Sequence, residues 1–385
     1  MLLTIYFDIW LDKSNFNLLY KTRKEYIFYS MLKKICSKSW FGTVILGVLL
    51  LILSVLSLFV GVIDVAPEQL LSGDLEAWEL LLISRLPRLL AILCTGTGMS
   101  AAGLIMQQLC MNKFVSPTTG STISAAKLGI LIALVFMPNS TLWSRALFSF
   151  AFALLGTWIF VWFIQRIQFK DTVMVPLIGI MFGNIIGGVT SFIAYRFEMT
   201  QALSSWETGH FSLILRGRYE IVYLVVPLLI LAFIFSNHFN IVGMGKDFSQ
   251  NLGVNYKAVL FMGLTIAAAI TASVVVVVGS VSYIGLIVPN IIAMFKGDKI
   301  RGTLVDTALF GALFVLVCDV IARIVIAPYE LPIALIIGII GSILFIAILF
   351  HRLKHGRKAI RLGAASHAPC AAAADASTSQ GGDSV

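Results

Sequence analysis

The sequence has little charge and a large excess of apolar residues. Only 12% of its 385 residues are Asp, Glu, Lys or Arg, whereas 59% are hydrophobic and the mean hydropathy is +0.95. A water-soluble domain of this length cannot bury that much apolar surface, so lipid must be the solvent. At about 20 residues for each spanning helix, the chain has material for roughly ten spans in one bundle.

Paired cysteines and the common catalytic motifs are also missing. The five cysteines are scattered without a CxxC pair, which predicts small buried hydrophobic residues instead of a disulfide framework or a metal site: Cys36, Cys94, Cys110, Cys318 and Cys370. There is no HExxH, GxSxG or GxxxxGK[ST] motif, and Gly245-Lys246 is followed by Asp247. We therefore predict no enzyme active site and no ATP hydrolysis by this chain alone.

What the sequence does have is a series of apolar runs bounded by charged or turn residues. They cover residues 41–63, 89–110, 119–138, 143–165, 173–195, 221–236, 258–279, 284–295, 304–326 and 332–350. The eighth run is short and contains Gly285 and Pro289, which predicts a broken or cavity-lining helix. The pattern predicts an all-α, polytopic membrane protein with about ten transmembrane helices.

Glycines at helical spacing predict where these helices pack closely. Gly179, Gly183 and Gly187 recur every fourth residue in the fifth run, and the second run contains Gly96, Gly98 and Gly103. Small residues let a neighbouring backbone approach in lipid, so we interpret both groups as packing surfaces and not as substrate contacts.

The basic residues indicate the orientation. They give a net charge of +9, but they stand at the ends of apolar runs and do not gather on one soluble face, so no nucleic-acid partner is expected. Basic clusters at residues 33–38 and 352–361 flank the first and last runs, which predicts a multi-pass protein of the cytoplasmic membrane with both termini in the cytoplasm. Five basic residues fall on the outer side and need another explanation: Arg85, Arg88, Arg216, Arg218 and Arg323.

Composition divides the chain into three segments. Residues 1–40 are mixed and form either a cytoplasmic N-terminal extension or, before Met31, the product of an upstream start codon. Residues 41–350 hold the ten-helix domain. Residues 351–385 begin with basic residues and continue into an Ala- and Ser-rich tail that cannot form a core, so this segment is expected to be a cytoplasmic, disordered tail.

Ionisable residues inside apolar runs are costly in hydrocarbon and are usually paired or functional. The candidates are Lys127, Asp306, Asp319 and Arg323. Asp319 and Arg323 lie four residues apart and are expected to pair on one helix face, as a structural ion pair or as part of a functional outward-facing site. Asp306 lies near the inner end of its run, which disfavours a proton-coupled carrier.

Four ordered blocks of residues extend over roughly residues 40–350. The first runs from Arg85-Leu86-Pro87-Arg88 through Gln107-Gln108 to Asn112 and Pro117, and the others are Met244–Val254, Gly279–Pro289 and Asp319–Gly341. They resemble the signatures of the ferric-siderophore and cobalamin permease family of ABC importers. Within that family, Asn112–Gly120 and Val288–Asn290 are similar to the subgroup for catecholate siderophores such as petrobactin. Three residues depart from the broader pattern, where Pro, His and Arg are usual: Ser280, Asn290 and Ala293.

The resemblance implies a type II ABC importer permease fold and a set of partners. These are a second permease, identical or homologous, two cytoplasmic ATPase subunits and an extracytoplasmic siderophore-binding lipoprotein. ATP and Mg²⁺ would bind the ATPase subunits, and no cofactor would bind this chain. The function implied is translocation of an iron(III)–siderophore complex, with cobalamin or haem as alternative substrates and a secondary carrier as a weaker alternative.

The resemblance also assigns roles to single residues. Docking of the binding protein is implied for Arg85, Arg88 and Arg323, whose guanidinium groups can grip carboxylates in two places. Coupling to the ATPase is implied for Gly245, Lys246, Asp247, Gln250, Leu252, Gly253 and Val254. The translocation path or its gate is implied for Gln107, Gln108, Asn112, Pro117, Gly285 and Pro289.

Overall fold

The computed structural model describes residues 39–60, 74–119, 121–166, 174–215, 217, 219–297, 300–327, 329–348 and 350. Over these ranges the regular secondary structure is helical, without strands. The chain divides into one unit, Met1–Gly338, and a second, Ile339–Val385, whose described residues are mostly the end of an apolar helix that spans Ile333–Ile348. The predicted tail 351–385, nearly all of the predicted extension 1–40, and Arg216 and Arg218 lie outside the described residues.

Six of the described helical stretches are long and apolar enough to cross a membrane. The second of these is continuous from Leu75 to Leu109 and includes a π-helical stretch before its main helix. The six are α2 (Ser39–Phe59), α4 with η1 and α5 (Leu75–Leu80, Leu81–Arg85 and Leu86–Leu109), α7 (Leu142–Arg166), α8 (Met174–Arg196), α13 (Tyr256–Val278) and α15 (Ile300–Ile324).

A bent pair and three shorter apolar helices account for the remaining predicted runs. The pair consists of η2 and α10 (Glu220–Leu224 and Val225–Ile234), followed by α11 (Ser236–Val242), which turns away by 60°. The shorter helices are α6 (Thr122–Phe136), α14 (Ile284–Lys296) and Ile333–Ile348. Two short helices, α9 (Thr200–Glu207) and α12 (Lys246–Asn251), lie in connections. The all-α, multi-pass prediction is confirmed, and each predicted run contains a helix.

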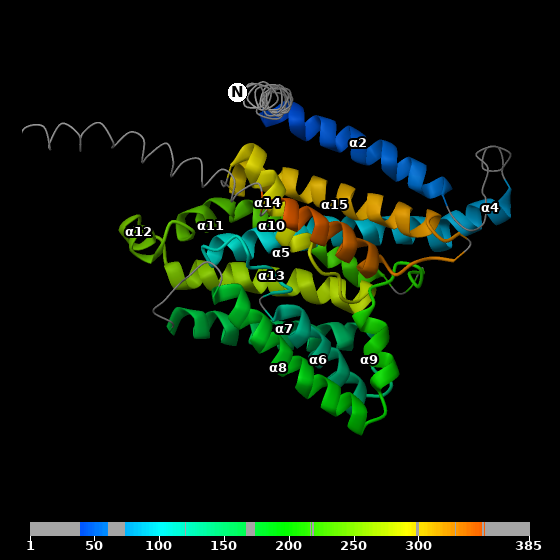
Figure 1. Ribbon diagram of the computed structural model, residues 1–385, viewed down its shortest axis with the longest axis horizontal. Coiled ribbons are helices and arrows are strands. Elements are labelled where there is room, and N and C mark those ends of the chain that lie inside the picture. Colours follow the sequence, from blue (N-terminus) through cyan, green and yellow to red (C-terminus); the bar gives the residue numbers. More distant parts are fainter. Residues whose placement is uncertain are drawn as a thin grey trace, which may run out of the picture. The chain divides into compact units, whose positions relative to one another are not determined.

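Helix α5 forms the centre of the unit Met1–Gly338. Buried residues make up 83% of the most apolar part of its span, against 11% for α2 and 17% for α8. Its main partners are α15, α13 and α14, which surround it in Figure 1. Because hydroxyl groups in hydrocarbon need hydrogen-bond acceptors, Thr97 and Ser100 donate to carbonyl groups one turn earlier in α5, of Leu93 and Gly96.

Glycine determines how closely the partners approach α5. A Cβ atom on Gly96 would lie 2.5 Å from the Cα of Ala312 in α15, and one on Gly103 would lie 1.9 Å from the carbonyl oxygen of Gly285 in α14. Neither position can hold a larger side chain, because the atoms in the way belong to backbones. The interpretation of these α5 glycines as packing residues is confirmed.

The three glycines of α8 differ in how closely neighbouring atoms pack against them. A Cβ on Gly179 would lie 1.8 Å from the carbonyl oxygen of Thr119, and one on Gly183 would lie 3.4 Å from Ser124 Oγ, whereas one on Gly187 would meet nothing within 4 Å. The packing prediction is confirmed for Gly179, while Gly187 faces open space in this unit. Cys94 and Cys318 are buried free thiols, as predicted, whereas the free thiol Cys110 is only half-buried.

Candidate functional site

Four charged side chains meet beside the N-terminal half of α5. We call them the outer ion cluster: Arg88, Asp319, Arg323 and Glu330. Arg88 Nη1 donates to both carboxylate oxygens of Glu330, at 2.8 and 2.9 Å, and its Nη2 donates to Asp319 Oδ1 at 2.8 Å. Arg323 donates to the other oxygen of Asp319 through Nε at 2.8 Å. Two cations and two carboxylates therefore compensate one another.

The four side chains of the outer ion cluster differ in how exposed they are. The side chain of Asp319 is 1% exposed, that of Arg323 6%, that of Arg88 13% and that of Glu330 20%. The predicted Asp319–Arg323 ion pair is confirmed. The bonds of Arg88 to Asp319 and Glu330 were not predicted, and they give Arg88 internal partners in addition to any that it would find on another protein.

The same cluster fastens one end of α2. Arg323 Nη1 donates to the carbonyl oxygens of Ser57 and Val60, at 3.0 and 2.7 Å, and Nη2 donates to Ser57 Oγ at 2.7 Å. Arg85 Nη1 donates to the carbonyl oxygen of Leu58. The last carbonyls of a helix have no intrahelical partner, so guanidinium donors suit this position.

A second polar contact fastens the other end of α2. Thr43 Oγ1 donates to Asp306 Oδ1 at 2.6 Å, and Lys296 Nζ donates to the other carboxylate oxygen of Asp306 at 2.5 Å. Asp306 was a sequence candidate, and the structure pairs it with Lys296, at the end of α14. Lys296 lies ten residues before Asp306 and in a different helix, so helical spacing in the sequence could not predict this pair.

The segment 243–254, between α11 and α13, combines tight turns with exposed side chains. Gly245 and Gly253 have φ values of +114° and +75°, where a side chain is strained. Ser249 is buried, and its Oγ donates to the carbonyl oxygens of Ile241 and Gly245 at 3.0 and 2.6 Å, which braces the short helix α12 against α11.

The exposed side of this segment is partly apolar. Met244, Phe248 and Leu252 recur every fourth residue and are 66%, 47% and 56% exposed. The predicted coupling residues Lys246, Asp247 and Gln250 are exposed beside them, and Val254 is half-buried. A short helix that presents apolar side chains framed by polar ones has the composition of a protein-docking surface.

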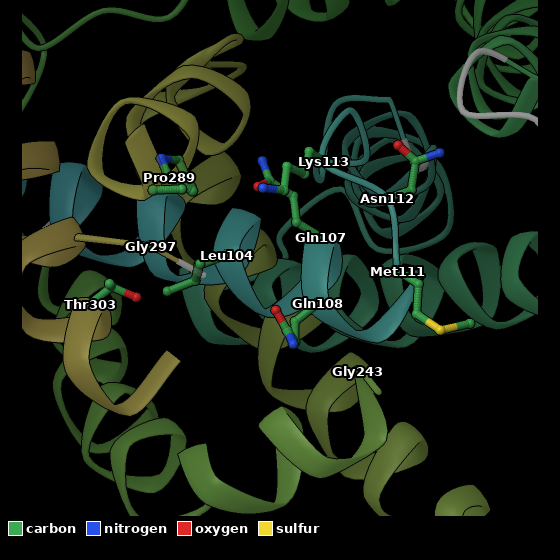
Figure 2. A pocket seen from close by; sticks show the side chains of 11 residues that line it. Leu104, Gln107, Gln108, Met111, Asn112, Lys113, Gly243, Pro289, Gly297 and Thr303 are labelled. Carbon is green, nitrogen blue, oxygen red and sulfur yellow. The ribbon is translucent and has the colours of Figure 1, made fainter. Parts of the chain in front are cut away.

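The six predicted gate residues gather where α5 ends against α14. Gln107 Nε2 donates to the carbonyl oxygens of Gly285 and Leu286, at 3.2 and 3.3 Å. A Cβ on Gly285 would lie 3.1 Å from Pro117 Cδ. Gln107, Gln108, Asn112 and Pro289 line one hollow of about 250 Å³ together with Gly243 and Thr303 (Figure 2).

Two of the residues that depart from the broader family pattern, Asn290 and Ala293, lie at this junction. Asn290 is buried, and its Nδ2 donates to the carbonyl oxygens of Lys113 and Leu286, at 2.8 and 2.7 Å. The loop before α14 contains Gly279 and Tyr283 at φ values of +90° and +69°. Asn290 thus ties the loop after α5 to α14 through amide hydrogen bonds. Among the described residues, no three His, Cys, Asp or Glu side chains gather as a metal site.

A bundle of apolar helices packed around a central helix is the architecture of a multi-pass membrane protein. A solved structure assigned to the metal-chelate type of ABC transporter, in an inward-facing conformation, has the same fold: its TM-score is 0.70 at 23% identity, covering 80% of this chain and 98% of that one.

The sequence identifies the family within this class. The sequence model of the FecCD transport family matches residues 49–351, and the chain belongs to that family. It is 46% identical over 307 residues to the petrobactin import system permease protein YclN of Bacillus subtilis, covering 80% of this chain and 97% of that protein. It is 36% identical over 298 residues to the ferric-anguibactin transport system permease protein FatD of Vibrio anguillarum, covering 77% and 95%.

Proposed function

We propose that this chain is the permease subunit of an ATP-driven importer that moves an iron(III)–siderophore complex of the petrobactin class across the cytoplasmic membrane. The observation that carries the proposal is the 46% identity to a petrobactin permease over 97% of its length. The sequence contains no phosphate-binding loop, so the ATP and Mg²⁺ chemistry is proposed to reside on partner ATPase subunits.

The ATPase subunits are proposed to dock on the segment 243–254 in the cytoplasm. Three observations support this position: the exposed apolar side chains, the polar residues Lys246, Asp247 and Gln250 beside them, and the bracing of α12 by Ser249. A braced element moves as a unit, so a displacement of the ATPase can reach the helices that the segment joins.

The binding protein is proposed to dock at the opposite end, where Arg85, Arg88 and Arg323 lie. Arg88 is the more exposed of the two cluster arginines, and Glu330, its most exposed carboxylate partner, can be exchanged for a carboxylate of the binding protein. Arg323 is almost fully buried, so its proposed contribution is to hold Asp319 and the end of α2 in place.

A second permease, identical or homologous, is proposed to pack on α8. Most of this helix is exposed in the isolated chain, and a Cβ on Gly187 or Gly188 would meet nothing within 4 Å. Small residues at an exposed helix face allow another helix to approach closely in lipid. Both termini lie in the cytoplasm in this arrangement, and the substrate crosses between the two permeases.

Uptake of radiolabelled iron tests the proposal. Cells that lack the gene are supplied with iron as petrobactin, hydroxamate, citrate or haem complexes, and with labelled cobalamin in parallel. We expect loss of petrobactin-type uptake alone, restored by the gene on a plasmid. Loss of cobalamin or haem uptake instead would assign the alternative substrate. Transport by the purified chain in vesicles, driven by an ion gradient without ATPase subunits, would replace the importer with a carrier.

A further inference from the structure

Gly243, at the end of α11, leaves room for the side chain of Gln108. Its φ is −66°, a conformation that any residue adopts. A Cβ at this position would lie 2.2 Å from Nε2 of Gln108, 2.6 Å from its Cγ and 2.7 Å from its Cδ. The side chain of Gln108 therefore lies along the backbone of Gly243, and Figure 2 shows it between α5 and that residue.

Gln108 is next to the residue that holds α14. Gln107 Nε2 donates to the carbonyl oxygens of Gly285 and Leu286 at the start of that helix. The last turn of α5 thus touches two elements at once, the segment 243–254 through Gln108 and α14 through Gln107. A displacement at Gly243 that moves this turn also moves α14, because the Gly103–Gly285 approach leaves no slack between the backbones.

The contact between Gln108 and Gly243 is held by hydrogen bonds on one side and borders a hollow on the other. Ser249 ties α12 to Ile241, only two residues before Gly243, so the docking surface and Gly243 move together. On the open side lies the hollow of about 250 Å³ bounded by Gln108, Gly243 and Pro289. In the wild-type protein Gln108 lies against Gly243, whereas a methyl group added at position 243 would push its side chain into this hollow, and the contact between the segment and α5 would be lost.

We propose that Gln108 is the positioning residue that transmits movement of the segment 243–254 to α14, and that this movement reaches Gln108 through its contact with Gly243. This inference rests on the proposed function, because the ATPase subunits supply the movement. It assigns to Gln108 a mechanical contact with the coupling segment in place of a contact with the substrate.

The test uses the complete transporter in proteoliposomes, with the number of iron chelates transported per ATP hydrolysed as the measurement. We expect Gly243→Ala and Gln108→Ala each to lower this ratio at least several-fold while the subunits still assemble. We expect the double variant to regain much of the ratio, because the methyl group added at position 243 fills the space that the Gln108 amide leaves. Gly302→Ala, where a Cβ meets nothing within 4 Å, and the exposed Gln201→Ala are matched controls.

Each outcome is decisive. A wild-type ratio in Gln108→Ala overturns the inference, as does a double variant that assembles, hydrolyses ATP and is no better than Gly243→Ala. If Gly243→Ala does not assemble, Gln108→Ala alone decides, since it removes atoms and creates no overlap. A wild-type complex that transports no iron chelate contradicts the proposed function itself, whereas unaffected variants of an active complex contradict only this inference.

Discussion

Arg88 and Asp319 lie 231 residues apart in the sequence, yet Arg88 Nη2 donates to Asp319 Oδ1 at 2.8 Å. The second carboxylate oxygen of Asp319 accepts from Arg323, so one buried carboxylate serves two guanidinium groups. Removing it leaves two cations side by side in a site with little water, whereas removing the more exposed Glu330 leaves Arg88 one remaining carboxylate.

Asp319→Asn is therefore expected to destabilise the permease by about 3–5 kcal/mol, the usual cost of breaking a buried ion pair from one side. Thermal unfolding of the purified protein in nanodiscs measures the effect. Glu330→Gln is the matched control and should cost clearly less, because its side chain is 20% exposed. Equal losses in the two variants would contradict the central role of Asp319.

The docking proposal predicts that Glu330→Gln strengthens binding of the binding protein. If a carboxylate of the binding protein replaces Glu330 on Arg88, the Arg88–Glu330 bond must first be broken. Weakening that bond lowers the cost of docking by about 1.5 kcal/mol, which raises the affinity for the binding protein roughly ten-fold. Arg88→Gln should weaken binding by a similar factor. Titration of nanodisc-embedded transporter with the binding protein measures both, and an affinity indifferent to Arg88 would contradict docking at this residue.

Gly103→Ala tests the close approach of α5 and α14. The added methyl group would lie 1.9 Å from the carbonyl oxygen of Gly285, so we expect a cost at or above the usual range of about 1–3 kcal/mol for overpacking. Gly47→Ala in α2 is the control, since its Cβ meets nothing within 4 Å. Expression level and thermal unfolding in detergent report the difference, and a fully stable Gly103→Ala protein would disagree with the packing described.

Gly253 tests the backbone of the coupling segment. Its φ of +75° costs a residue with a Cβ atom about 1–2 kcal/mol, but Asn adopts this region more readily. We expect Gly253→Ala to lower ATPase-subunit affinity and coupled transport, with Gly253→Asn closer to wild type. Pull-down of the ATPase subunit by the detergent-solubilised permease measures the first effect. An Ala variant that matches Asn would mean that this turn does not position the docking surface.

Phe248 tests the apolar docking face. Phe248→Ser removes an exposed aromatic ring and should lower ATPase-subunit affinity by about 2 kcal/mol or more if the ring enters a pocket. Met137→Ser is the control, because Met137 is similarly exposed, 48% against 47%, in the connection after α6. Isothermal titration of the permease with the ATPase subunit distinguishes them, and equal affinities would place the docking surface elsewhere.

The sequence was sufficient for the helices and for contacts between near neighbours. Apolar runs predicted each spanning segment because lipid imposes one composition on them, and the four-residue spacing predicted the Asp319–Arg323 pair. The 60° turn between α10 and α11 was not predicted, because the apolar run ends at Ser236, beside the bend, and the more polar residues 237–242 do not indicate a second helix.

Contacts between distant parts of the chain could not be predicted. Arg88 meets Glu330 across 242 residues, and Gln107 meets Gly285 across 178. Such pairs depend on which helices become neighbours, and apolar periodicity carries no information about this when every helix is apolar. The motif resemblance grouped Gln107 with Gly285 but assigned no hydrogen bond, and no sequence pattern pairs Lys296 with Asp306.

The polar fastening of α2 has a consequence for biogenesis. Two of the contacts of α2, Thr43 with Asp306 and Ser57 with Arg323, reach residues about 260 positions later in the chain. At about 5–20 residues per second, synthesis of that stretch takes roughly 10–50 s. During this interval Arg85 can already donate to the carbonyl oxygen of Leu58 at the end of α2, whereas the contacts with Asp306 and Arg323 form only after α15 has been synthesised.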